Sequence, residues 1–241
     1  MAVRGRGSKD GSPTPHADCV LCGKDYPFRL PSAIVDAAKH GRLIIFAGAG
    51  ISTEQPGLYP DSFYEETRTC LSVMPEDTSF PSVMTCYEKE YGRLQLIEDV
   101  IDRVNYAKTY RIFRNLITRF HQELATIPQI HEVITTNWDD YFETVCGMLP
   151  IVTDGDYVYY KLPGRKIYKI HGSIGNVSTI IATLEDYKRR EEELKGSLIG
   201  GTLRHLLGTK VVVFVGYSLR DDGVHSRVAR DRASRQCGEW R

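Results

Sequence analysis

Four short polar segments carry residue types that could bind a nucleotide and act on it. They are Gly48 to Ser52 (GAGIS), Thr136 to Asp140 (TNWDD), His171 to Ser173 (HGS) and Gly216 to Ser218 (GYS). In the first, Gly48, Ala49 and Gly50 leave no large side chain between the backbone and a docking phosphate. The second supplies amide and carboxylate groups, and the histidine of the third can accept a proton near neutral pH. These residue types favour a nucleotide-binding site.

Each segment has a simpler interpretation when it is taken alone. A glycine-rich turn after a strand is often only a tight connection, and Asn137 to Asp140 could cap the start of a helix. His171 before a glycine is most often a hydrogen-bonded loop residue, and Gly216 to Ser218 could be a plain turn. The functional interpretation depends on their shared position, because each segment follows an apolar run.

The apolar runs predict the strands of a parallel sheet. They consist mostly of bulky apolar residues, which is typical of strands covered on both faces. The runs are Leu43–Phe46, Val133–Ile134, Ile167–Ile170 and Val211–Val215. Because helical patterns separate them, we expect a doubly wound, Rossmann-like α/β fold whose polar segments meet in one crevice at the carboxyl edge of the sheet.

A helical insertion is expected between the first two strands. Apolar residues recur at spacings of three and four within residues from about 82 to 124, which could form a lid over the crevice or an oligomer interface. A short helix after Pro31, a helix from near Tyr141 and a charged helix from 184 to about 207 are also expected. The alternating aromatic residues of Tyr157 to Lys161 predict an edge hairpin.

Composition limits the classes of protein that fit. The 241 residues carry a formal net charge of zero, so no basic field indicates nucleic acid. No apolar run approaches the roughly 20 residues that span a bilayer, and the N-terminus lacks the apolar core of a secretory signal. The six cysteines are mostly far apart, which favours a reducing cytoplasm over a disulfide scaffold. We therefore expect a cytoplasmic globular protein.

The order of the motifs GAGIS, PD, TNWD, HGS and VGYSL resembles that of the sirtuin family over roughly residues 32 to 222. Any single motif would be unspecific, but five in one order are not. The resemblance implies a sirtuin-like fold and NAD as the ligand. It further implies that the pyrophosphate contacts Gly48, Ala49, Gly50 and Ser52. Pro60 and Asp61 match a loop that closes over the nicotinamide side, although an extra residue precedes them and the usual arginine is missing.

The resemblance also implies which residues carry the reaction. Asn137 and Asp139 match the pair that holds the nicotinamide ribose and carboxamide, and His171 matches the catalytic imidazole. Gly216 and Ser218 match the contact with the adenosine half. In this interpretation His171 accepts a proton from a ribose hydroxyl or from water, and Asn137 holds the water or the ribose hydroxyls. Asp139 binds the carboxamide or braces the loop.

One departure from the family separates this chain from the protein deacylases. Sirtuin deacylases carry a zinc ribbon with two CxxC pairs after the catalytic histidine, but no cysteine lies between His171 and Val211. A four-thiolate zinc site cannot form there, so we expect no zinc ribbon and no metal. An isolated CxxC at Cys19 and Cys22 is more readily a free thiol pair than a metal site. The paired aspartates, Trp138 and GYSLRDD look more like the sirtuin-like NAD hydrolases of prokaryotic anti-phage defence.

That likeness implies an NAD glycohydrolase, the effector of an abortive-infection system, with NAD as its substrate. It also implies control by oligomerisation and by a sensor domain or partner protein outside this chain. Two alternatives stay open: an NAD-dependent protein deacylase or ADP-ribosyltransferase, and a non-catalytic module that binds NAD or ADP-ribose.

The two ends of the chain differ in character from its middle. Residues 1–17 are rich in glycine, serine, proline and arginine and predict a disordered lead. Residues 18–222 form the expected NAD-binding domain. Residues 223–241 show no strand pattern, so we expect either a truncated or frame-altered version of a longer protein or a naturally disordered tail.

Overall fold

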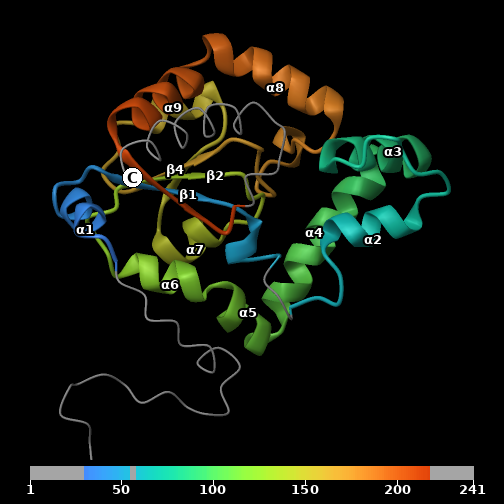
Figure 1. The fold of residues 1–241 in the computed structure, drawn as a ribbon, viewed down its shortest axis with the longest axis horizontal. Coiled ribbons are helices and arrows are strands. Elements are labelled where there is room, and N and C mark those ends of the chain that lie inside the picture. Colours follow the sequence, from blue (N-terminus) through green and yellow to red (C-terminus); the bar gives the residue numbers. More distant parts are fainter. Residues whose placement is uncertain (1–29, 55–57, 218–241) are drawn as a thin grey trace, which may run out of the picture.

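A five-stranded, entirely parallel sheet forms the centre of the computed structural model, which describes residues 30–54 and 58–217 (Figure 1). The strands are β1 (Leu43–Ala47), β2 (Glu132–Thr135), β3 (Leu149–Ile151), β4 (Lys166–Lys169) and β5 (Val211–Val215). Their order across the sheet is β3-β4-β2-β1-β5. Strands β2, β3 and β4 thus lie on one side of β1, and β5, the last in the chain, lies on its other side. This arrangement makes the fold doubly wound and Rossmann-like, as predicted.

Helices cover both faces of the sheet because β1 is apolar on both. Leu43, Ile45 and Ala47 pack with the core that α1 (Ser32–Lys39), α6 (Arg119–Ala125) and α7 (Tyr141–Cys146) contribute to. Ile44 and Phe46 pack on the opposite core, with α8 (Leu184–Gly196) and α9 (Leu198–Thr209). This alternation follows from the two-residue period of a strand.

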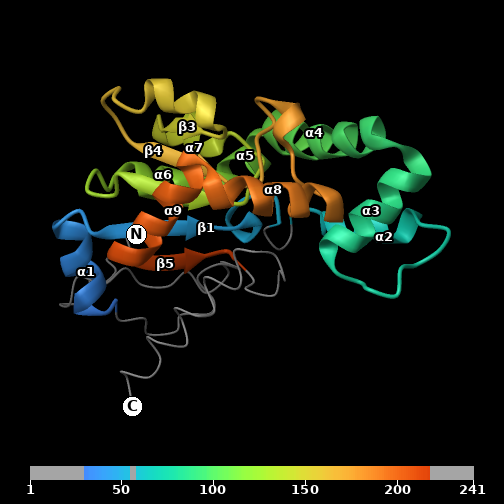
Figure 2. The ribbon, with the colours of Figure 1, turned by 90° about the horizontal axis from the view of Figure 1, so that it is seen from above.

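The helical insertion lies between β1 and β2. It comprises α2 (Phe63–Cys70), α3 (Phe80–Tyr91), α4 (Arg93–Thr109), α5 (Arg111–Ile117) and α6. Helices α2, α3 and α4 share an apolar core of their own, which includes Met84, Leu96 and Val100. They lie beyond the end of the sheet toward which the strands point (Figures 1 and 2). We refer to α2–α4 as the helical module.

Three local expectations need correction or refinement. The edge hairpin predicted for Tyr157 to Lys161 is wrong, because Asp154–Tyr159 forms a 3-10 helix closed by a capping box at Thr153. The three-residue strand β3 was not predicted. The charged helix predicted from 184 to about 207 is two helices, because the Ser197 side chain accepts a hydrogen bond from the Gly200 N–H and starts α9.

Within the described ranges, no helix combines the length and apolar character needed to cross a membrane. Residues 1–29 and 218–241, which include Cys19, Cys22 and both predicted terminal segments, lie outside these ranges.

Candidate functional site

The sheet order brings the four polar segments to one edge. Strands β4, β2, β1 and β5 are consecutive neighbours and all parallel, so the segments that follow them lie side by side. Direct bonds join them: the Ile170 N–H donates to Thr135 O at 3.0 Å, and the Ile174 N–H donates to Trp138 O at 2.9 Å. The winding direction reverses at β1, which is where doubly wound sheets bind ligands.

The glycines after β1 allow close backbone contact with the end of β5. The Gly48 N–H donates to Val215 O at 2.9 Å and the Gly50 N–H to Gly216 O at 3.0 Å. A Cβ on Gly48 would lie 2.5 Å from Gly216 O, and Gly216 itself has φ +62°. These two amides are thus already bonded to the protein, and contact of this turn with a pyrophosphate stays a prediction. Ser218 lies outside the described residues.

Ser52 joins the two candidate catalytic residues of the TNWDD segment. Its buried hydroxyl donates to Asp139 Oδ2 at 2.8 Å and accepts from Asn137 Nδ2 at 3.1 Å. Asn137 Nδ2 also donates to Gly48 O at 3.2 Å. The sequence placed Ser52 against the pyrophosphate, whereas in the structure its hydroxyl holds Asn137 and Asp139 beside the glycine turn.

The orientation of the Asn137 amide is fixed by its partners. Gly48 O can only accept, so the nitrogen must face it and the amide oxygen must point elsewhere. That oxygen, Oδ1, is buried and has no hydrogen-bond partner among the described residues. An unsatisfied buried acceptor is costly, so this atom is suited to receive a donor from a ligand.

Asp139 is positioned as a brace. It is 2% exposed, and its carboxylate accepts from Ser52 and, at 3.3 Å, from the Tyr141 N–H that begins α7. Trp138, which lies between Asn137 and Asp139 in the sequence, packs its ring against Phe63 and Phe80 of the helical module.

His171 follows β4 and is 7% exposed. Its ring meets the Tyr187 ring edge to face at a centroid distance of 4.9 Å, so α8 supports one side of the imidazole. Gly172, which follows it, has φ +88°, and a Cβ there would lie 2.0 Å from Thr179 O. The backbone after His171 is therefore held in a path that only glycine fits.

Asp61 lies on the loop leading into α2 and is exposed, with its backbone carbonyl held by Arg103 Nη2 at 3.0 Å. Arg103 is a buried cation on α4 that the sequence analysis missed. It also pairs with Glu54 at 3.1 Å and Glu66 at 2.7 Å and lies over the Tyr59 ring at 3.9 Å. Burial raises the pKa of Glu54, although the Arg103 charge opposes this. Arg103 thus connects Glu54, Tyr59 and Asp61 to the helical module.

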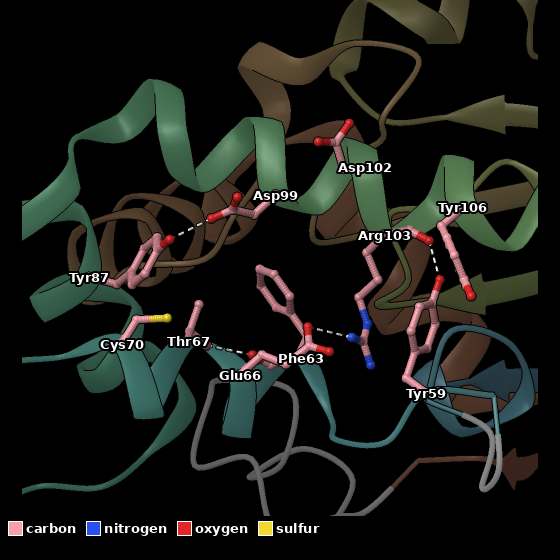
Figure 3. A pocket seen from close by; sticks show the side chains of 10 residues that line it. All are labelled: Tyr59, Phe63, Glu66, Thr67, Cys70, Tyr87, Asp99, Asp102, Arg103 and Tyr106. Atoms are coloured by element: carbon pink, nitrogen blue, oxygen red, sulfur yellow. Dashed lines mark hydrogen bonds and ion pairs between the residues drawn. The ribbon is translucent and has the colours of Figure 1, made fainter.

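A cavity of about 340 Å³ lies beside Arg103, between α2, α3 and α4 (Figure 3). Its walls are aromatic and acidic, and the Tyr87 hydroxyl donates to Asp99 at 2.6 Å across one end. Burial raises the pKa of Tyr59, another wall residue, to about 12. The cavity is lined by none of the predicted site residues, so it is separate from the strand ends that carry them. Within the described ranges, no group of three or more histidine, cysteine or acidic side chains is placed to hold a metal ion.

Comparison with known proteins matches part of the chain to one domain family and most of it to two curated proteins. Residues 131–237 match the family described as SIR2-like domain. The chain is 27% identical to the NAD(+) hydrolase ThsA of Enterococcus faecium over 193 residues, which cover 77% of this chain and 39% of that protein. It is 23% identical to defense-associated sirtuin 2 of Bacillus subtilis over 209 residues, covering 80% of this chain and 19% of that protein. This chain therefore spans well under half the length of either relative.

Proposed function

We propose, from the match of residues 131–237 to the SIR2-like domain family, that the chain is an NAD hydrolase that releases nicotinamide and ADP-ribose. The observation that carries the proposal is the fixed Asn137 amide, whose buried oxygen has no partner among the described residues. Asn137 follows β2, which lies in the sheet between β1, before the glycine turn, and β4, before His171. The name of the Enterococcus relative, NAD(+) hydrolase, supports the same substrate.

The proposed reaction is displacement of nicotinamide by water at C1′ of the ribose. The C1′–N bond breaks and its electron pair leaves with nicotinamide, while the water oxygen bonds to C1′ and loses a proton. Asn137 Oδ1 accepts a hydrogen bond from the water or from a ribose hydroxyl, and His171 accepts the proton. Ser52 and Asp139 keep Asn137 in place, so much of the rate enhancement would come from positioning.

The test is to incubate the purified protein with NAD and quantify free nicotinamide and ADP-ribose. We expect His171→Ala and Asn137→Ala each to lower the rate by about 100-fold or more, as for loss of a positioned acid–base group. His205→Ala and Asn105→Ala are matched controls, since both residues are exposed helix positions away from the crevice. Full activity in a folded His171 or Asn137 variant would remove that residue from the mechanism.

The same assay separates the alternatives. Nicotinamide release that requires an acyl-lysine peptide would indicate a deacylase, and transfer of ADP-ribose to protein would indicate a transferase. NAD binding without turnover would indicate a sensor module.

We further propose that the activity serves anti-phage defence, in line with the name of the Bacillus relative. Oligomerisation and a sensor domain or partner would control it. Light scattering at increasing protein concentration, measured with the rate of NAD cleavage, tests this control, and a monomer at full activity would contradict the oligomer.

A further inference from the structure

A lysine is buried in the sheet directly beside the candidate site. Lys169 is the last residue of β4, two positions before His171, and its side chain is 0% exposed. An unpaired ammonium at such a depth would be strongly unfavourable, so its partners explain why it can be there.

Among the described residues, the partners of the Lys169 ammonium group belong to the TNWDD segment or to the helix that follows it. The Nζ atom donates to the backbone carbonyl of Asp139, lies 3.4 Å from the carbonyl of Trp138 and pairs with Glu143 Oε1 on α7 at 2.9 Å. Three donors meet three acceptors, which matches the full capacity of an ammonium group. Burial raises the pKa of Glu143, and the Lys169 charge opposes that rise.

These contacts complete a clamp on residues 137–139. On one side, Ser52 and Gly48 hold the side chains of Asn137 and Asp139. On the other side, Lys169 holds the backbone carbonyls of the next two positions, Trp138 and Asp139. The side chains of Asn137 and Asp139 are thus bonded to the turn after β1, and the backbone carbonyls of the segment are bonded to Lys169 at the end of β4.

The stability of the fold does not by itself explain why a charged side chain is buried at position 169. Replacing a buried ion pair by well-packed apolar groups often leaves stability unchanged or raises it. A lysine donates to two carbonyls at once, which an apolar side chain cannot do.

We propose that Lys169 is a positioning residue for the reaction, which sets the Asn137–Asp139 backbone relative to His171. The inference rests on the proposed function for its kinetic consequence. Its structural consequence, order in the segment, can be measured without turnover.

The test compares two neutral side chains of similar length in one background. In Glu143→Gln, the carboxylate is removed so that no buried charge is left unpaired when Lys169 is replaced. Lys169→Met then abolishes hydrogen-bond donation, whereas Lys169→Gln keeps an amide donor for the carbonyls. We expect kcat for NAD cleavage to fall at least about tenfold in the Met double variant, with KM within about threefold, and to recover partly in the Gln double variant. Glu143→Gln alone is no control, because it leaves the buried Lys169 ammonium without its counter-charge, so the two double variants are compared with each other.

Fluorescence provides the readout that is independent of activity. The chain has two tryptophans, so Trp240→Phe in every protein leaves Trp138 as the sole indole. Acrylamide quenching of Trp138 should increase in the Met double variant and increase less in the Gln double variant. This result would support the clamp even if the parent protein released no nicotinamide, an outcome that would count against the proposed function alone.

Unchanged kcat and unchanged quenching in a folded Met double variant would overturn the proposal. So would equal losses in the Met and Gln double variants, because the hydrogen-bond donor would then be irrelevant. Failure of both double variants to fold would also overturn it, since the ion pair would then determine stability rather than position.

Discussion

At the scale of single residues, the candidate site depends on groups that are shared between segments. Ser52 is the clearest case, because one hydroxyl is both donor to Asp139 and acceptor for Asn137. Its role as a bridge could not be seen from the GAGIS motif, since its partners lie more than 80 positions further along the chain. A substitution at Ser52 should therefore affect Asn137 without removing it.

We predict that Ser52→Ala lowers both stability and activity. The change leaves Asp139 Oδ2 without its donor and Asn137 Nδ2 without one acceptor in a buried site, which should cost about 1–3 kcal/mol. Chemical unfolding and nicotinamide release measure the two effects. Ser178→Ala is the control, because that hydroxyl bonds to Asn176 on the exposed surface. Equal stability of the two variants would show that the Ser52 bridge is energetically unimportant.

Two glycines allow backbone strain to be separated from crowding. Gly172 and Gly147 both have positive φ, +88° and +63°, but a Cβ on Gly147 would meet nothing within 4 Å, whereas one on Gly172 would overlap Thr179 O. We predict that Gly147→Ala costs about 1–2 kcal/mol and that Gly172→Ala costs more and displaces His171. Thermal unfolding of both variants tests this, and a smaller loss for Gly172→Ala would contradict the close approach.

At the scale of elements, apolar periodicity in the sequence predicted the longer strands and helices. It did not predict the short strand β3 or the boundary between α8 and α9. The run Leu43–Phe46 predicted β1 because it is apolar on both faces, and the strand is indeed buried throughout. Strand β3 has only three residues with a proline in the middle, so it gives no pattern. Between 184 and 209 the helical pattern continues through Ser197, and only the cap hydrogen bond shows that one helix ends there.

Helix α8 depends on a buried carboxylate at its start. Burial raises the pKa of Asp186, but hydrogen bonds from the Ala182 and Thr183 N–H groups and the pair with Arg93 at 2.8 Å outweigh it, so the pKa lies below 3.8. Because the folded state holds this proton less tightly than the unfolded chain, the charge stabilises the fold above pH 3.8. That contribution is lost as the pH falls through the lower folded pKa.

We predict that Asp186→Asn lowers the free energy of unfolding by about 1–2 kcal/mol at pH 7. The difference from the parent should shrink as the pH falls below 3.8 toward the lower pKa of the folded state, because the Asp186 carboxylate becomes protonated while asparagine is neutral throughout. Urea unfolding at pH 7 and at several values below 4 measures this difference. Glu192→Gln on the same helix is the control, since Glu192 is largely exposed and pairs only with Lys195. A difference that persisted unchanged in acid would show that the charge of Asp186 is not its source.

At the scale of the whole molecule, the sheet with a core on each face meets the helical module, which has a core of its own. Apolar patterns predicted the sheet and a helical insertion from about 82 to 124, which leaves out α2, and polar residues at strand ends indicated the site segments. The cations that tie these parts together were not predicted. Arg103 lies in mid-helix and Lys169 in a strand, where a charge alone predicts a solvent-facing side chain. Their acidic and carbonyl partners are distant in sequence, so only the fold reveals them.

Trp138 connects the sheet to the helical module, because its backbone belongs to the β2–α7 loop while its ring packs with Phe63 and Phe80 of the module. The other apolar links from the module core are Ile174, Ile180 and Ala182, and polar links run from Arg93 to Asp186 and Ile180 and from the Leu184 N–H to Thr85. Local opening of the module should therefore require less free energy than opening of β1 and β2. Trp138→Leu should lower the opening free energy of α2 and α3 further, by about 1–3 kcal/mol, because leucine fills only part of the space that the indole ring occupies.

Hydrogen exchange resolved by segment measures this prediction. We expect faster exchange in α2 and α3 of the variant and nearly unchanged exchange in β1. Tyr110→Leu is the matched control, since Tyr110 is an exposed aromatic residue at the α4–α5 junction. If the variant accelerated exchange equally in β1 and in α2, the helical module and the sheet would unfold as one cooperative unit. In that case Trp138 would not join two units that open separately.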